Sequence, residues 1–357
     1  MSKSKVYFFA VSNGENDASM ADKAVQLADV AGLAGTVTCD RPCAIKQHFG
    51  EAGNKGYIKP PITRAVVDWV TRVGGWPFVT DTNTLYTGRR NNAIDHMALA
   101  HEHGFTHNAI RAPIIIADGL LGADQITVPI TGGKHFKEVR IASAGHEAAS
   151  AIVLSHVKGH CLSGMGGAIK NIGMGFAARA GKLAQHHEGY PLFDHEKCRG
   201  CGVCARRCPT EAIQVRKKAE IDAPRCIGCG ECLVLCPHDA IGFSWDAEGP
   251  VLIERICEHA LGFLTTKRGR VGFLNFLTHV TQDCDCTEGK QKVLYPDVGI
   301  FASTDVVAVD KAAADMALTR YGKDIWLDWW PDSHYTAQFE YGAKLGLGSM
   351  DYDLVTL

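Results

Sequence analysis

Eight cysteines in one short segment are the residues of this sequence whose spacing most clearly predicts chemistry. They form two runs of the pattern C-x2-C-x2-C-x3-C-P, one ending at Pro209 and the other at Pro237. In such a run, three closely spaced thiolates can hold three corners of a 4Fe–4S cubane, and the fourth cysteine ligates the cluster of the other run. The spacing therefore predicts two 4Fe–4S clusters with crossed ligands, namely Cys198, Cys201, Cys204 and Cys236 for the first and Cys226, Cys229, Cys232 and Cys208 for the second.

The two cysteine runs form an internal repeat. Residues 198–215 match residues 226–243 at nine of 18 positions, with an offset of 28 residues. Two short, similar halves are typical of a bacterial two-cluster ferredoxin. Zinc is the alternative metal for C-x2-C pairs, but zinc sites use four ligands in separated pairs, whereas these cysteines occur as two quartets.

A second candidate metal site is the sequence Asp283-Cys284-Asp285-Cys286. Two cysteines separated by one residue at the end of a strand could reach the same metal ion, with the aspartates behind them. Two free thiols or a redox-active pair are the alternatives. Cys284 and Cys286 are thus predicted as a possible third metal or sulfur site.

A glycine-rich segment after a predicted buried strand is the candidate for a substrate site. A glycine-rich turn from a strand into a helix presents free amides and the positive end of the helix, which favours an anion. A tight structural turn is the alternative interpretation. The predicted catalytic residues are Lys158, His160 and Lys170, and the predicted substrate-binding residues nearby are Gly166, Gly167 and Asn171.

Other candidate substrate-binding residues follow predicted parallel strands. Ligand groups in α/β proteins lie at the carboxyl ends of such strands. This position predicts His48, Asp81, Asn83 and Asp118 as further members of the site.

Hydrophobic periodicity predicts the elements that would position these residues. Short apolar runs alternate with helix-like stretches, which is typical of an α/β fold with a mostly parallel sheet and helices on both faces. The expected strands are 5–11, 44–48, 77–81, 113–118, 152–156, 271–277 and 298–302, and the expected helices are 19–33, 63–73, 92–103, 166–183, 251–264 and 306–320.

The cysteine segment interrupts this alternation without ending it. We therefore expect an α/β domain whose first part is 1–189 and whose second part is 246–357, with a small α+β ferredoxin-like insert at 190–245. A surface loop is the position at which an inserted module disturbs a fold least.

Composition narrows the class of protein. The 357 residues are 46% hydrophobic and 21% charged, and their formal net charge is −2, which gives no reason to expect a nucleic-acid partner. No apolar run reaches the 18 or so residues of a membrane span, and the N-terminal stretch lacks the features of a signal peptide. We expect a cytoplasmic protein, in which cysteines are more often metal ligands or redox thiols than disulfides.

Basic residues around the first cysteine run suggest a docking face. A solvated basic turn is the alternative interpretation. If the face docks a partner, an acidic electron carrier of the ferredoxin or flavodoxin kind would fit it. The residues are Arg206, Arg207, Arg216, Lys217 and Lys218.

Several segments outside the cysteine runs resemble one known family. They are IKQHFGEAGN (45–54), FVTDTNTLYTGRRN (78–91), IIIADGLLG (115–122), residues 154–182, TQDCDC (281–286) and residues 297–315. With the ferredoxin-type runs, they resemble the uncharacterised iron–sulfur centre family built on a domain of unknown function, family 362. The resemblance runs from about residue 40 to 320 and implies the domain layout and the clusters, but no reaction.

Two functions are compatible with these patterns. The first is an iron–sulfur oxidoreductase or electron-transfer protein that passes low-potential electrons to a small anionic substrate on the α/β domain. The second is a non-enzymatic protein that binds, delivers or senses a metal or sulfur species at Cys284 and Cys286.

Overall fold

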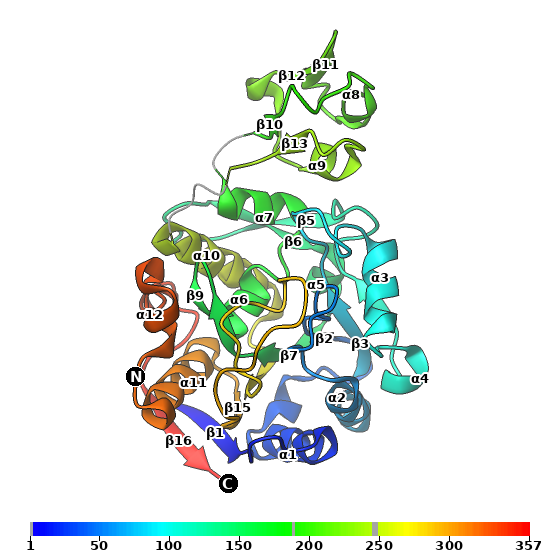
Figure 1. Cartoon of the computed structure of the whole chain (residues 1–357). Helices are drawn as coiled ribbons and strands as arrows, with labels where there is room; N and C mark the ends of the chain where they lie inside the picture. The colour runs from blue at the N-terminus through cyan, green and yellow to red at the C-terminus, as the bar shows by residue number, and fades with distance from the viewer. Residues whose placement is uncertain (1–2, 188–189, 245–248) are drawn as a thin grey trace.

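A computed structural model describes residues 3–187, 190–244 and 249–357, and its main feature is an eight-stranded sheet (Figure 1). The strand order is β16-β1-β15-β14-β7-β2-β3-β4. β15 is antiparallel to both of its neighbours, and the other five pairings are parallel. The bounds are β1 (Ser4–Ala10), β2 (Pro42–Lys46), β3 (Trp76–Asp81), β4 (Ile114–Ile116), β7 (Ser150–His156), β14 (Val271–Leu277), β15 (Gly299–Ser303) and β16 (Tyr352–Thr356).

Helices cover both faces of this sheet, and strand β7 shows why the sequence requires it. Every residue of β7 is buried, and successive side chains enter different cores: Ala151 and Val153 one, Ile152 and Leu154 the other. Side chains alternate across a strand, so an uninterrupted apolar run needs cover on two sides. The predicted α/β fold class is confirmed.

Each core has its own helices. The first core receives side chains from α5 (Ser143–Glu147), α6 (Ala168–Gly173), α10 (Gly249–Lys267), α11 (Val306–Tyr321), α12 (Ile325–Trp329) and α13 (Ala337–Lys344). The second receives them from α1 (Asp17–Val30), η1 (Leu33–Thr36), α2 (Pro60–Arg72), α3 (Ala93–Glu102) and α4 (His107–Ile110). None of the helices in the described part of the chain is long and apolar enough to cross a membrane.

The helix expected over 166–183 is wrong as one element. The chain instead forms a hairpin of β8 (Lys158–His160) and β9 (Gly164–Gly166), then α6, and then α7 (Arg179–His186). Between the helices, the carbonyl of Phe176 accepts from the Ala142 amide at 2.9 Å, and the Ala178 amide donates to the Arg140 carbonyl at 3.1 Å. Backbone pairing with the hairpin of β5 (Gln125–Pro129) and β6 (Glu138–Ala142) has replaced the helical hydrogen bonds there.

The cysteine segment projects beyond α7 as a small unit of its own (Figure 1). It contains β10 (Leu192–Phe193) paired with β13 (Ile241–Gly242), β11 (Ile213–Val215) paired with β12 (Ala219–Ile221), α8 (Val203–Arg207), η2 (Ala223–Arg225) and α9 (Glu231–Leu235). Because β10 pairs with β13, the chain enters and leaves this cysteine module at one place. The boundaries predicted at 189/190 and 245/246 adjoin residues 188–189 and 245–248, which lie outside the described residues.

Candidate functional site

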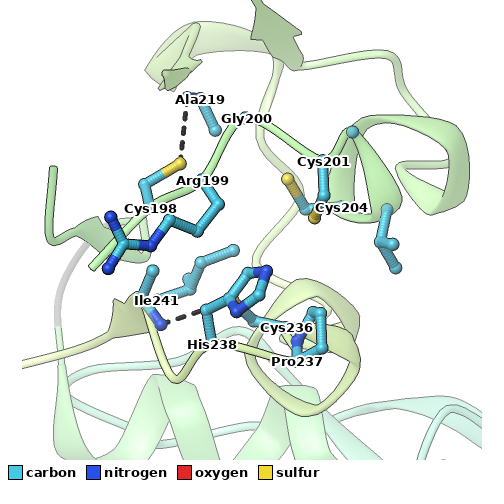
Figure 2. A pocket seen from close by; sticks show the side chains of 13 residues that line it. Cys198, Arg199, Gly200, Cys201, Cys204, Ala219, Cys236, Pro237, His238 and Ile241 are labelled. Atoms are coloured by element: carbon cyan, nitrogen blue, oxygen red, sulfur yellow. Dashed lines mark hydrogen bonds between the residues drawn. The ribbon is translucent and has the colours of Figure 1, made fainter. Parts of the chain in front are cut away.

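The first cysteine quartet surrounds a hollow in the cysteine module (Figure 2). Cys198, Cys201, Cys204 and Cys236 all line it, together with backbone of the first cysteine loop. Three of these cysteines come from the first run and the fourth from the end of the second. This is the grouping that the spacing predicted.

The second quartet surrounds a separate hollow. Its lining includes Cys226, Cys229 and Cys232 from the second run and Cys208 from the end of the first. All fourteen cysteines of the chain are free, so none of these eight is held in a disulfide.

Backbone amides point at cysteine sulfurs in both quartets. In the first, the Ala219 amide donates to Cys198 Sγ at 3.4 Å, and the Ala240 amide donates to Cys236 Sγ at 3.3 Å. In the second, the Ala212 amide donates to Cys208 Sγ at 3.2 Å, and the Gly228 amide donates to Cys226 Sγ at 3.4 Å. Such bonds stabilise thiolates, and hydrogen bonds to sulfur are a feature of iron–sulfur sites.

Four thiolates in one hollow repel one another unless a cation is bound among them. Burial raises the pKa of Cys232, and the neighbouring Cys229 and Cys226 raise it further. A metal core that takes four thiolate ligands removes this repulsion. The donor sets therefore fit metal clusters at both hollows.

A larger cavity of about 380 Å³ lies in the α/β domain. Lys46 ends β2, Asp81 ends β3 and His156 ends β7, and all three line the cavity. The three strands are parallel neighbours, so the cavity lies at the carboxyl edge of the sheet, where open α/β sheets bind ligands.

The cavity wall contains buried ion pairs. Lys46 Nζ donates to Asp81 Oδ1 and to Asn171 Oδ1, each at 2.9 Å. Arg90 Nε donates to Glu51 Oε2 at 3.0 Å, and its Nη1 lies 3.5 Å from Asp81 Oδ2. These pairs hold polar side chains from distant segments in fixed positions around the cavity.

Two lysines leave the cavity with excess positive charge. Among the described residues, neither Lys170 nor Lys182 forms an ion pair with a carboxylate; Lys182 Nζ donates to Thr82 Oγ1 at 2.6 Å, and Lys170 Nζ lies 3.8 Å from Cys284 Sγ. Burial lowers the pKa of Lys182 to about 8, although Asp118 opposes the shift. Burial also acts to lower the pKa of Lys170, but the thiols led by Cys284 outweigh it and raise that pKa. The cavity is suited to an anion.

The Cys284–Cys286 loop reaches the same cavity as Lys170. The hydrogen bond from Cys286 holds the pKa of Cys284 well below its usual value, burial opposes the shift, and Lys170 adds to it. Burial, with Lys170 next, lowers the pKa of His160. The ligand atoms of His160, Cys284 and Cys286 all lie within 4.8 Å of one another.

The structure brings most of the predicted substrate-site residues together and leaves three out. The cavity lining includes His48, Asp81, Lys158, His160, Gly167, Lys170 and Asn171. Gly166, Asn83 and Asp118 are absent from it. Asn83 Nδ2 instead donates to Asp118 Oδ1 at 2.9 Å, and both side chains are buried, which ties two loops together.

The glycine-rich turn does not present the free amides that the sequence led us to expect. The amides of Ala168 and Ile169, at the start of α6, donate to the two carboxylate oxygens of Asp310 at 2.6 and 2.8 Å. A Cβ at Gly167 would lie 2.4 Å from Asp310 Oδ1, so the glycine admits this carboxylate. The predicted anion site at the helix end is therefore wrong, because an internal anion from α11 occupies it.

Several cavity residues were not predicted from the sequence. Lys46, Tyr86, Arg90 and Lys182 line the cavity; they lie within the segments that carry the family resemblance but were not predicted as site residues. Lys46 had a usable signal, since it is a charged residue that ends an apolar strand, PCAIK. Lys182 had none, because its position depends on the break between α6 and α7.

Helix α7 lies between the cysteine module and the rest of the α/β domain (Figure 1). Its Lys182 lines the cavity, while Leu183 belongs to the buried apolar cluster that includes Cys232 and Leu233. Leu85 belongs to that apolar cluster and also lines the cavity. The apolar cluster that contains Cys232 thus reaches the candidate substrate site through Leu85.

Comparisons with known proteins found similar structures and one family. The lactate racemase apoprotein from Thermoanaerobacterium thermosaccharolyticum matches with 9% identity and a TM-score of 0.42 over 87% of this chain and 57% of that chain. A Thermotoga maritima protein solved by a structural genomics consortium matches with 10% identity and a TM-score of 0.46 over 87% of this chain and 60% of that one. This chain thus spans less than two thirds of either structure.

No curated protein matches the sequence. A family profile described as a domain of unknown function (DUF362) matches residues 43–315, a range that includes the cavity loops and the cysteine module. The chain belongs to the DUF362 family.

Proposed function

We propose that this protein is an iron–sulfur redox protein that passes low-potential electrons to a small anionic substrate in the α/β domain. The observation that carries the proposal is the arrangement of eight cysteines around two hollows, each with three ligands from one run and one from the other. Two bound 4Fe–4S clusters would supply one-electron transfer at low potential.

The donor sets favour iron–sulfur clusters over zinc. Each hollow has a full set of four cysteines and lies among amides that donate to sulfur; His238 also lines the first hollow, but the four thiolates there already supply all the ligands that a 4Fe–4S cluster takes. Left-handed backbone at the paired glycines Gly200 and Gly228, with φ of 66° and 64°, lets the two loops curve around their hollows in the same way.

The cavity supports an enzyme rather than a simple carrier. Lys170 and Lys182 offer positive charge to an anion, and His160 and Lys158 lie in the same wall. Because α7 is shared between the cavity and the packing under the second quartet, a bound substrate would lie close to that quartet. Short distances are what electron exchange between a cluster and a substrate requires.

Metal analysis of anaerobically purified protein tests the proposal. We expect about eight iron and eight acid-labile sulfide per chain and, after reduction, the electron paramagnetic resonance signals of two interacting 4Fe–4S clusters. Zinc without labile sulfide would contradict cluster binding. If a protein with both clusters bound neither turned over an anionic substrate nor bound an anion in the cavity, the enzymatic part of the proposal would be wrong. The protein would then be an electron carrier with a large docking domain.

The second candidate is a protein that binds or delivers a metal or sulfur species through Cys284 and Cys286. The proximity of His160 to these two thiols favours it. Transfer of a metal or of sulfane sulfur from this loop to an acceptor, with no need for reduced clusters, would distinguish delivery from redox catalysis.

A further inference from the structure

Three potential metal ligands meet at the wall of the cationic cavity. His160 ends strand β8, while Cys284 and Cys286 come from the loop that follows β14, more than 100 positions further along the chain. Their ligand atoms lie within 4.8 Å of one another, and all three side chains line the cavity. None of them belongs to either cysteine quartet.

Hydrogen bonds to other segments of the chain hold the loop that carries the two thiols in position. The carboxylate of Asp285, between the two cysteines, lies 3.0 Å from Nδ1 of His156, away from the thiols. The carbonyl of Asp285 accepts from the Glu51 amide at 2.9 Å, and the carbonyl of Cys286 accepts from Tyr86 Oη at 3.1 Å. Anchoring the middle residue in this way turns both cysteine side chains toward the cavity, so little ordering is needed when they bind the same ion.

The imidazole of His160 is also oriented. Its Nδ1 lies 3.0 Å from Ser163 Oγ and 3.1 Å from the Ser163 amide, and Ser163 Oγ donates to the Met165 carbonyl at 3.2 Å. Nδ1 is therefore engaged on the protein side, which leaves Nε2 for the cavity. Nδ1 accepts from the Ser163 amide, so the imidazole proton lies on Nε2 in this structure. Coordination through Nε2 would move that proton to Nδ1; the Ser163 amide would then turn away, and Ser163 Oγ would accept from Nδ1.

We propose that His160, Cys284 and Cys286 form a mononuclear site for a thiophilic divalent metal ion, with Zn²⁺ as the probe that fits the donor set. One imidazole and two thiolates make a neutral complex with a divalent ion. Three protein ligands leave a fourth position, and here it faces the cavity. An open fourth position is the arrangement of catalytic rather than structural zinc sites.

The surroundings indicate what would occupy the open position. Lys170 Nζ lies 3.8 Å from Cys284 Sγ, and Lys158 is its neighbour in the cavity wall, since a Cβ at Gly166 would lie 3.4 Å from Lys170 Cδ and 3.6 Å from Lys158 Cε. A ligand that binds the metal through an anionic oxygen or sulfur would gain a second contact from these ammonium groups. The substrate class is therefore a small anion whose carboxylate, oxyanion or thiolate group binds the metal. This goes beyond the proposed redox function and does not depend on it.

Zinc-edge X-ray absorption on the full-length, cluster-loaded protein tests the site directly. The protein is treated with a weak chelator and supplied with one equivalent of Zn²⁺ under anaerobic conditions. We expect a shell with two sulfur atoms at about 2.3 Å and a nitrogen shell at about 2.0 Å that carries the imidazole signature. Because the measurement is specific for zinc, bound iron does not interfere. An all-oxygen shell, or a four-sulfur shell from a cysteine quartet, would overturn the proposal.

Variants supply the matched comparison. Cys284→Ser and Cys286→Ser should each abolish stoichiometric Zn²⁺ binding, and His160→Ala should weaken it by about tenfold or more. Cys161→Ser is the control, because Cys161 lines the cavity beside His160 but lies outside the ligand group. Iron and sulfide are measured on the same samples, so loss of the Zn²⁺ site can be distinguished from loss of the clusters. Equal Zn²⁺ affinity in Cys284→Ser and Cys161→Ser would refute the assignment.

Discussion

Arg140 donates a hydrogen bond from Nη1 to the backbone carbonyl of Ile227, at 3.1 Å. Arg140 belongs to β6 of the α/β domain, and Ile227 lies between the first two cysteines of the second quartet. Gly230, in the same loop, packs closely against the α/β domain, because a Cβ at this glycine would lie 3.2 Å from Cγ of Arg179. The second quartet is therefore the one that lies against the α/β domain.

The buried guanidinium of Arg179 should tune the potential of a cluster at the second quartet. Arg179 is 0% exposed, and burial lowers its pKa to about 10, although Asp118, Glu231 and Cys229 all act to raise it. A nearby cation stabilises the more negative, reduced cluster. We predict that Arg179→Met lowers one of the two midpoint potentials by some tens of millivolts, on the order expected for one charge at an effective dielectric constant of about 20.

Lys218 provides the matched test at the other quartet. Its Nζ donates to the Cys198 carbonyl at 2.6 Å. Lys218→Met should lower the other potential, and Arg179→Lys should leave both close to their original values. A redox titration monitored by electron paramagnetic resonance measures the two midpoint potentials separately. Equal shifts of both potentials in both variants would refute the assignment of each cation to one cluster.

Crossed ligation should appear when the fourth cysteine of each run is replaced. Cys208 lines the hollow of the second triplet and Cys236 that of the first. Cys208→Ser should therefore expose Cys226, Cys229 and Cys232 to alkylation. Peptide mapping after anaerobic alkylation, with iron analysis, measures this, and Cys39→Ser is the control because Cys39 is an exposed thiol of the α/β domain. Exposure of the cysteines that share a run with Cys208 would mean that the crossed assignment is wrong.

The basic residues of the cysteine module should accelerate reduction by an acidic donor. Arg206 and Arg207 are exposed, and Arg207 pairs with Glu231 at 3.1 Å. We predict that the double change to glutamate slows reduction by a ferredoxin severalfold at low salt. The difference should vanish at high salt, because the Debye length falls from about 30 Å at 0.01 M to about 3 Å at 1 M. Stopped-flow kinetics measure the rate.

Arg320→Glu is the control for this experiment, because Arg320 is an exposed arginine of α11, in the α/β domain. It should change the rate little at any salt concentration. If Arg320→Glu slowed reduction as much as the double change, net charge rather than a docking face would explain the effect.

Residue spacing and strand ends were enough to predict part of the fold and part of the site. Cysteine spacing predicted which four residues share each hollow, and a charged group after a buried strand predicted Asp81 and Lys158 in the cavity. The occupied amides at α6 could not be predicted, because Asp310 lies 142 positions from Ala168. Strand direction was also inaccessible: the apolar run of β15 fits a parallel or an antiparallel strand equally well.

The break between α6 and α7 shows the same limit in the helical part of the site. Residues 166–183 have the composition of one helix, and local propensity favours that interpretation. Pairing of Ala177 with Ile141 of β6 overrides it. The break gives α7 its own start, and Lys182 of that helix lines the cavity. A tertiary contact therefore decides which lysine can meet a ligand.

Anion binding in the cavity should depend on pH through Lys182. Burial lowers the pKa of this lysine to about 8. The ammonium group is charged below that pH and loses its proton above it, so affinity for an anion should be high near pH 7 and fall as pH rises through about 8. A lost charge-assisted hydrogen bond is worth roughly 1.5–3 kcal/mol, which predicts about a tenfold or larger decrease in affinity. Oxalate is a suitable probe because its charge is constant over this range, and isothermal titration calorimetry measures its binding.

Substitutions of Lys182 separate its titration from that of the other cavity groups. Lys182→Gln should bind oxalate weakly at every pH, because the charge is absent throughout. Lys182→Arg should bind it with little change from pH 7 to pH 9, because a guanidinium keeps its charge even when it is buried beside other cations. The cavity also contains Lys46, whose pKa burial lowers and Asp81 raises, but Lys46 already donates to Asp81 at 2.9 Å. If the Lys182→Arg variant still lost affinity above pH 8, another group such as Lys46 would be the one that titrates.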